Sequence, residues 1–139
     1  MDVRPIFDHE LEIAFPIVRE LRAHLDEEEF LLYARRQREA GYELWGAFDG
    51  RALVGVIGFR PLVTFARGLH LHVDDLVVTA ERRDGGVGRA LLAAAEGEAR
   101  KRGLERVFLD SRPEALGFYQ EQGYLQHTSL IVKKDLAAS

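Results

Sequence analysis

The sequence predicts a single domain of the α/β class, spanning residues 1–139, in which helices and strands are mixed along the chain. Three observations support this prediction. The length suits one folding unit, and no repeat or linker rich in Gly, Ser or Pro divides it. Apolar residues recur with helical spacing in some stretches and alternate with polar ones in others. Asp49 and Gly50 lie between two alternating stretches, and this pair is typical of a tight hairpin turn.

The expected elements are, in order, a strand, two helices, three strands, a helix, a strand, a helix and a last strand or strand pair. They cover residues 3–7, 9–24, 26–39, 42–48, 52–59, 69–78, 87–102, 106–110, 113–122 and 125–133. In the first helix Pro16 should kink or divide the chain, because proline lacks the N–H that a helix interior needs. In the second helix Phe30, Leu31 and Tyr33 should face inward, and Gly41 should end the element. The strands expected after the second helix are apolar or alternating runs. In the helix expected at residues 87–102, apolar residues keep helical spacing until Gly103 ends the element.

Composition narrows the class of protein. A hydrophobic share of 47% and a charged share of 30% are ordinary for a soluble globular chain. No apolar run is long enough to span a bilayer and the N-terminus lacks a signal-peptide pattern, so we expect a cytoplasmic location and no membrane partner. Without cysteine there is no disulfide, thiolate zinc site or cysteine nucleophile. The formal net charge of −4 argues against a nucleic-acid partner.

A glycine-rich turn between an apolar strand and a helix, at residues 77–92, is the most informative segment. Such a helix start exposes unpaired N–H groups at the positive end of the helix dipole, and glycines let an anion approach them. Arg82, Arg83 and Arg89 add the positive charge that a diphosphate requires. The alternative is a plain turn with solvated arginines. A Walker loop does not fit because no Lys-Ser or Lys-Thr follows, and Leu91 replaces the third glycine of a dinucleotide fingerprint.

Residues 83–88, with the sequence Arg-Asp-Gly-Gly-Val-Gly, resemble the Arg/Gln-x-x-Gly-x-Gly/Ala signature of the GNAT acetyltransferase superfamily. The resemblance implies the GNAT acyl-CoA N-acyltransferase fold, with a central mixed, mostly antiparallel sheet flanked by helices. It also implies that backbone groups of Leu76, Val77 and Val78 bind the pantetheine arm of acetyl-CoA. The residues implied to hold the CoA pyrophosphate are Arg83, Asp84, Gly85, Gly86, Val87, Gly88 and Arg89.

A second motif lies at residues 115–124, where Ala-Leu-Gly-Phe-Tyr-Gln-Glu-Gln-Gly-Tyr is similar to the family's Ala-x-x-Phe/Leu-Tyr-Glu-x-x-Gly-Phe segment. The resemblance implies that Tyr119 protonates the departing CoA thiolate. Taken without the resemblance, Tyr119 is better explained as a core residue beside Phe118. Asp110, which precedes this motif, either faces the substrate or caps the following helix, and capping is the preferred interpretation.

Transfer of an acetyl group to an amine needs a base that removes a proton from the nitrogen. Strict alternation over residues 69–78 predicts one strand face that carries His70, His72, Asp74, Leu76 and Val78. His72 and Asp74 are the candidate bases, because some GNAT members place such residues at matching positions. An exposed strand face can equally be polar without any catalytic role. Asp75 falls in the apolar register, so it is either a paired buried carboxylate or displaced by a β-bulge.

Together these patterns predict an enzyme that transfers acetyl from acetyl-CoA, its co-substrate, directly to a primary amine of a small molecule or peptide, with no metal. The acceptor pocket of GNAT members draws on the first two helices and on a later loop, here residues 23–41 and 60–68. A homodimer is a further expectation, with the last strand as its pairing edge. Two alternatives stay open: a GNAT-fold module that binds CoA without turnover, and a different α/β protein that binds ATP or a dinucleotide.

Overall fold

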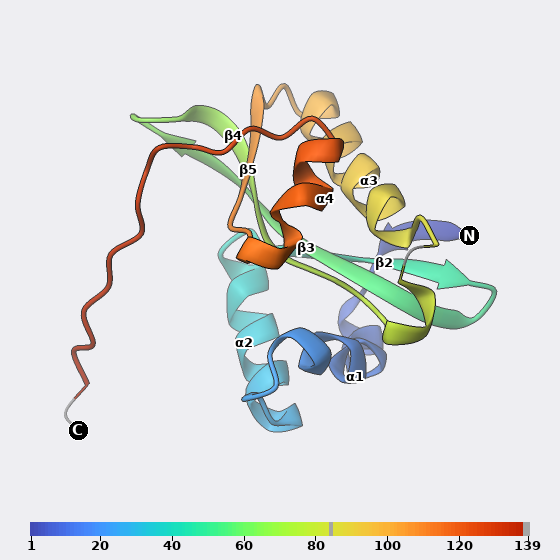
Figure 1. The fold of residues 1–139 in the computed structure, drawn as a ribbon. Coiled ribbons are helices and arrows are strands. Elements are labelled where there is room, and N and C mark those ends of the chain that lie inside the picture. Colours follow the sequence, from blue (N-terminus) through green and yellow to red (C-terminus); the bar gives the residue numbers. More distant parts are fainter. Residues whose placement is uncertain (84, 138–139) are drawn as a thin grey trace.

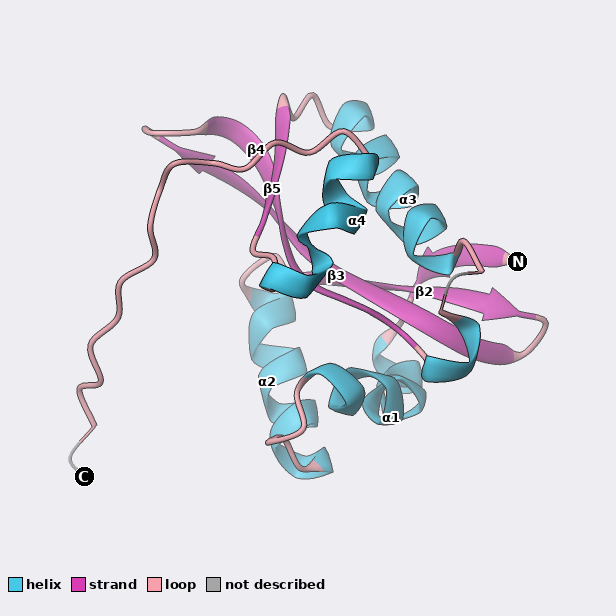
Figure 2. Ribbon diagram, in the orientation of Figure 1, coloured by secondary structure: helices cyan, strands magenta, loops and turns pink. Residues whose placement is uncertain are grey.

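The computed structural model describes residues 1–83 and 85–137, which form one five-stranded sheet with helices on both faces (Figures 1 and 2). The strands are β1 (Asp2–Pro5), β2 (Glu43–Asp49), β3 (Ala52–Thr64), β4 (Gly68–Val78) and β5 (Arg106–Leu109). They lie side by side in chain order. All neighbouring strands are antiparallel except β4 and β5, which are parallel, so the predicted mixed, mostly antiparallel sheet is confirmed.

The helices cover the two faces of the sheet in pairs (Figure 1). They are α1 (Leu11–Leu21), α2 (Glu27–Glu39), α3 (Val87–Lys101) and α4 (Leu116–Glu121), with short 3-10 turns η1 (Asp8–Glu10), η2 (Ala80–Arg82) and η3 (Pro113–Ala115). One buried cluster lies between the sheet and the α1–α2 pair, and a second lies between the sheet and the α3–α4 pair. Within the described part of the chain, no helix is both long and apolar enough to cross a membrane.

Two local expectations for the first helices, a division of the first at Pro16 and an inward Tyr33, are wrong. Pro16 lies inside α1 without dividing it. The carbonyl that its missing N–H leaves without a helical partner belongs to Glu12, and both residues lie on the exposed face, where water can bind that carbonyl. Tyr33 is 46% exposed instead of inward, because the buried face of α2 is set by Phe30 and Ala34, four residues apart.

A β-bulge at Asp74 divides β4 into two parts. Val73 pairs with Phe59 and Asp75 with Gly58, which leaves Asp74 opposite no residue of β3. The extra residue reverses the alternation. Val73 therefore packs in the α3–α4 cluster, whereas Val77 packs in the α1–α2 cluster. The prediction of strict alternation over residues 69–78 is therefore wrong, because it would place Val73 and Val77 on the same face of the sheet.

The parallel pairing of β4 with β5 stops well before β4 ends. It joins His70–Val73 to Arg106–Leu109, and among the described residues β4 runs on to Val78 without a β5 partner. The two strands thus separate at the bulge. On that side no strand of the described chain pairs with residues 74–78. Arginine side chains bond the carbonyls of Asp74 and Val78, and the other backbone groups on that side are available to a ligand.

The predicted last strand at residues 125–133 is wrong. The chain leaves α4 as an extended loop that runs away from the sheet (Figure 2). Its apolar side chains are uncovered, with Leu130, Ile131 and Val132 between 78% and 89% exposed. A strand needs both a partner for its backbone and cover for its apolar face, and within this single chain the segment has neither.

Candidate functional site

A cavity of about 1140 Å³ lies where β4 and β5 separate. Most of its lining comes from the end of β4, the loops after β4 and β5, the η3–α4 segment and the C-terminal ends of α1 and α2, and Arg60 and Ile131 complete it. Its lining includes Asp74, Asp75, Leu76, Val77, Val78, Arg83, Asp110 and Tyr119. Several of the predicted site residues are therefore neighbours around one space, although their positions span almost fifty residues of sequence. The volume exceeds the range of about 300–1,000 Å³ of most small-ligand pockets, so it suits a long ligand.

The start of α3 has the geometry of an anion site. Gly86 is its N-cap residue and adopts φ +84°, a left-handed conformation that side chains disfavour. The N–H groups of Val87, Gly88 and Arg89 belong to the first turn, where a helix offers them no acceptor. Asp84, also assigned to this turn from the sequence, lies outside the described residues.

The arginines beside this turn differ in where they point. Arg83 lines the cavity, and its Nε donates to the carbonyl of Val78 at 3.2 Å, which ties the turn to the end of β4. Arg82 instead pairs with Asp49 at 2.6 Å, at the β2–β3 hairpin. Arg89 is exposed in the first turn of α3. Of these three arginines, Arg83 is therefore the one that lines the cavity.

Tyr119, in α4, borders the same cavity from the opposite side. Its side chain is only 8% exposed and packs against the rings of Phe118 and Tyr124, with centroids 5.2 and 6.0 Å away. Burial raises the pKa of the Tyr119 phenol above its ordinary value. The hydroxyl therefore stays protonated at neutral pH, as a proton donor must.

The two candidate bases belong to one charged cluster on β4. Asp74 accepts two hydrogen bonds from Arg60, at 2.7 and 2.9 Å, so its carboxylate is held by a bidentate ion pair. His72 lies 3.8 Å from Asp74 and 3.5 Å from Asp110, measured from its Nε2. Asp74 and Asp110 line the cavity, whereas His72 is in contact with them without lining it.

The sequence predicts that Asp110 caps the following turn, but in the structure it does not. The residue at the N-cap of η3 is Arg112, and no side chain caps that turn. Asp110 instead faces the cavity beside His72. The physical reason is that β5 ends at Leu109, so Asp110 is the first residue that leaves the sheet where β4 and β5 part.

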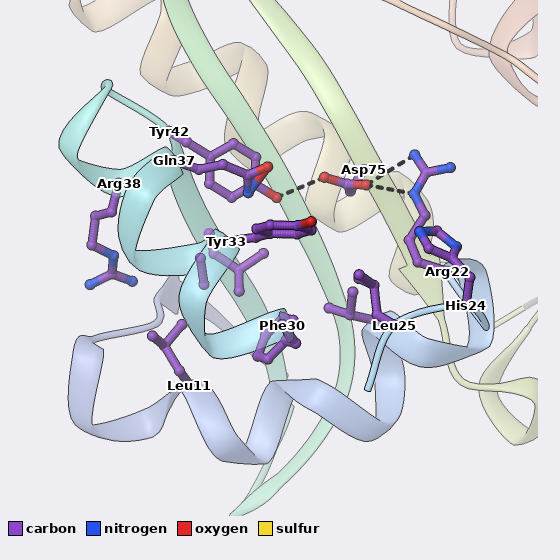
Figure 3. A pocket seen from close by; sticks show the side chains of 13 residues that line it. Leu11, Arg22, His24, Leu25, Phe30, Tyr33, Gln37, Arg38, Tyr42 and Asp75 are labelled. Carbon is purple, nitrogen blue, oxygen red and sulfur yellow. Dashed lines mark hydrogen bonds and ion pairs between the residues drawn. The ribbon is translucent and has the colours of Figure 1, made fainter. Parts of the chain in front are cut away.

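Asp75 is the centre of a half-buried polar network whose partners the sequence did not predict (Figure 3). Its carboxylate accepts from the Tyr42 hydroxyl at 2.8 Å and from Arg22 Nε at 3.1 Å. Arg22 also donates to the carbonyl of Asp74 at 3.1 Å and so holds the bulge. Both open alternatives for Asp75 are realised, because it is a paired carboxylate next to a bulge. Burial, followed by the nearby charge of Asp75, raises the pKa of Tyr42 well above its ordinary value.

Comparison with known proteins adds an independent observation. The family model described as "Acetyltransferase (GNAT) family" matches residues 5–124. An uncharacterized N-acetyltransferase, YhdJ of Bacillus subtilis (strain 168), is 40% identical over 114 residues, which are 78% of this chain and 80% of that protein. A glucosamine 6-phosphate N-acetyltransferase of Trypanosoma brucei brucei is 36% identical over 77 residues, which cover 54% of this chain and about half, 52%, of that relative.

A solved structure with the same fold carries a ligand. It is an aminoglycoside N-acetyltransferase, AAC(6')-Iy, in complex with CoA. The two chains superpose with a TM-score of 0.86 over 98% of this chain and 95% of the other, at 17% sequence identity. At that identity the likeness establishes the shared architecture alone.

Proposed function

The chain belongs to the acetyltransferase (GNAT) family, whose members are acyltransferases, and we propose that it transfers an acetyl group from acetyl-CoA directly to a primary amine. The observation that carries this proposal is the cavity at the divergence of β4 and β5, which joins the open end of β4, Arg83 and Tyr119. In the proposed complex, backbone groups of Leu76, Val77 and Val78 bind the pantetheine arm. The glycine turn and Arg83 bind the pyrophosphate.

The reaction then needs two proton movements. The amine nitrogen attacks the thioester carbonyl carbon, the C–N bond forms, and the C–S bond breaks to release a thiolate. Tyr119 gives its proton to that thiolate, and its buried, protonated phenol supports this role.

The proton that the nitrogen loses goes to the Asp74–His72 cluster. Asp74 faces the cavity, so it is placed to meet the ammonium of the acceptor. His72, whose Nε2 is 3.8 Å from Asp74, can receive the proton through Asp74 or a water, because a histidine side chain can accept and pass on a proton. Arg60 keeps the Asp74 carboxylate in one orientation throughout.

The first experiment is thermal unfolding with acetyl-CoA, ATP or NAD. A ligand at 100 times its dissociation constant adds about 2.7 kcal/mol of stability. For a chain of this size that raises Tm by roughly 6–10 °C. We expect the shift with acetyl-CoA alone. A shift with ATP or NAD in its place would favour a nucleotide-binding protein and contradict the proposal.

The Tyr119→Phe variant tests turnover. We expect kcat to fall by about 10²–10⁴-fold, since general acid catalysis contributes that much, while acetyl-CoA still raises Tm. Release of CoA thiol in the presence of an amine is the assay, and glucosamine 6-phosphate, the acceptor in the name of the Trypanosoma relative, belongs among the amines tried. Stabilisation by acetyl-CoA without thiol release from any amine would instead indicate a CoA-binding module. Equal rates for both proteins would remove Tyr119 from the mechanism.

We also propose that the protein works in the cytoplasm and forms a homodimer through residues 125–133. The exposed Leu130, Ile131 and Val132, together with the short edge strand β5, support pairing with a second copy. Light scattering should give about twice the chain mass of 15.7 kDa, and Val132→Lys should lower it. A wild-type protein that stays monomeric at high micromolar concentration would contradict this arrangement.

A further inference from the structure

A second cavity, of about 300 Å³, lies between α1, α2 and β4 (Figure 3). Six of the thirteen side chains around it are apolar, and the rings of two tyrosines add aromatic surface: Leu11, Val18, Leu25, Phe30, Ala34 and Leu44, with Tyr33 and Tyr42. Leu11, Phe30 and Leu44 are at most 6% exposed, so the core forms the inner wall of this space, whereas the exposed residues His24, Tyr33 and Gln37 border its opening. An apolar group that covers such an apolar wall is removed from water, which favours its binding.

The charged groups that border this second cavity, Arg22, Arg38 and Asp75, are already engaged with protein partners. Asp75 has one carboxylate oxygen bonded to Tyr42 and the other to Arg22. Arg38 pairs with Asp8 at 2.8 Å and donates to the carbonyl of Ile6. His24 and Gln37 also line the space. A ligand group with many hydroxyls or a phosphate would lose its water here and find few partners, which costs free energy.

The second cavity adjoins the first at its polar end. Arg22, Gln37 and Asp75 line both spaces. Asp75 is the residue after Asp74, which the proposed function places next to the acceptor nitrogen. A molecule whose nitrogen lies at Asp74 can therefore extend past Asp75 into the apolar space.

We propose that the acceptor is a primary amine joined by a short spacer to an apolar group, aryl or branched alkyl, which the cavity between α1 and α2 binds. This inference rests on the proposed acetyl transfer. The size agrees with it, because an apolar cavity of about 150 Å³ admits benzene and this one is twice as large. The Asp75 network gives the cavity a rigid polar rim, and the apolar group supplies binding energy away from the reacting centre.

A matched pair of amines tests the proposal. With acetyl-CoA saturating, kcat/KM is measured for 2-phenylethylamine and for ethylamine, which lacks the ring. We expect a ratio of about 100 or more, since a single methylene in an apolar pocket is worth about 10–200-fold. A ratio near one overturns the proposal, as does a clear preference for glucosamine 6-phosphate.

Filling the cavity supplies the structural control. Ala34→Leu should push the ratio of the two kcat/KM values towards one, while Ala93→Leu, at an exposed position of α3, should leave it unchanged. If Ala34→Leu unfolds the protein, the smaller Ala34→Val carries the test. An unchanged ratio in a folded Ala34 variant overturns the proposal.

The two proposals fail in distinguishable ways. If acetyl-CoA raises Tm and another amine is acetylated, but 2-phenylethylamine is not preferred, the apolar acceptor is wrong and the acetyl transfer stands. If acetyl-CoA neither raises Tm nor releases thiol with any amine, both are wrong.

Discussion

Gly58, in the middle of β3, should be intolerant of any side chain because Tyr42 lies directly over it. A Cβ built at this position would stand 2.8 Å from Cε2 of the Tyr42 ring, and closer still to its Cζ and hydroxyl oxygen. The ring cannot give way easily, since Tyr42 is 7% exposed and its hydroxyl is bonded to Asp75. Gly58→Ala must therefore move Tyr42 and break that bond.

The cost has two parts. Overpacking in a core costs typically about 1–3 kcal/mol. The lost hydrogen bond to a charged carboxylate adds about 1.5–3 kcal/mol. A total of about 2.5–6 kcal/mol corresponds to a drop in Tm of roughly 8–20 °C for a domain of this size. Differential scanning calorimetry measures it, and Gly97→Ala is the matched control. Outside the local helix backbone, no atom lies within 4 Å of the place that a methyl group on Gly97 would occupy, so alanine there should stabilise α3 by about 0.5–1 kcal/mol.

A double-mutant cycle separates this steric cause from others. Tyr42→Leu removes the outer atoms of the ring, so Gly58→Ala made in that background should cost under about 1 kcal/mol. If the two substitutions are simply additive, the clash is not the cause. A Gly58→Ala protein that melts within a degree of the wild type would refute the reasoning outright.

Three further predictions concern charge. Arg83→Ala should raise the KM for acetyl-CoA about 10–100-fold, because a bond to a charged group is worth about 1.5–3 kcal/mol, whereas Arg82→Ala, which removes a pair on the hairpin side, should change it less than about twofold. The guanidinium of Arg4 lowers the pKa of Glu10 to about 2, so the stabilising pair is lost as pH falls from 4.5 towards 2. In urea titrations over that window Glu10→Gln should lose less stability than the wild type, and parallel losses would contradict the assignment. The pKa of Tyr42 is raised, so the unfolded phenol ionises first and stability should fall above about pH 10. Tyr42→Phe should flatten that fall, and an unchanged slope would show that other groups cause it.

Features that depend on near neighbours in the chain were predictable from the sequence. The hairpin at Asp49-Gly50 connects β2 and β3, and α2 begins at the N-cap Asp26, whose carboxylate accepts from the Glu29 N–H at 2.8 Å. The glycine turn lies before α3 as predicted, and the structure adds that Gly86 in it is left-handed. In each case the chemistry that fixes the backbone lies within a few residues.

Features that depend on distant partners were not predictable. Arg22 and Asp75 are 53 residues apart, and nothing local indicates that they meet. The sequence suggested a β-bulge only as one explanation for Asp75. Strict alternation of side chains, which repeats every two residues, cannot represent the extra residue Asp74. The segment at residues 125–133 has a strand-like composition, but strand formation depends on a partner that the composition does not reveal. One signal was present and overlooked: a glycine inside a strand, here Gly58, often marks the close approach of another group.

The bulge in β4 also sets which changes of length the gene can tolerate. Deleting Asp74 would remove the bulge and make Val73 and Asp75 consecutive residues, so Val73 and Val77 would keep their present faces while the widened opening beside β5 would lose its bulge. A one-residue insertion or deletion elsewhere in β4 would instead turn the side chains of one half of the strand to the opposite face. The hairpin between β3 and β4 bears no such constraint, since Phe65 at its tip is fully exposed. Insertions and deletions among descendants of this chain should therefore accumulate at that tip and be purged from the strand that follows it.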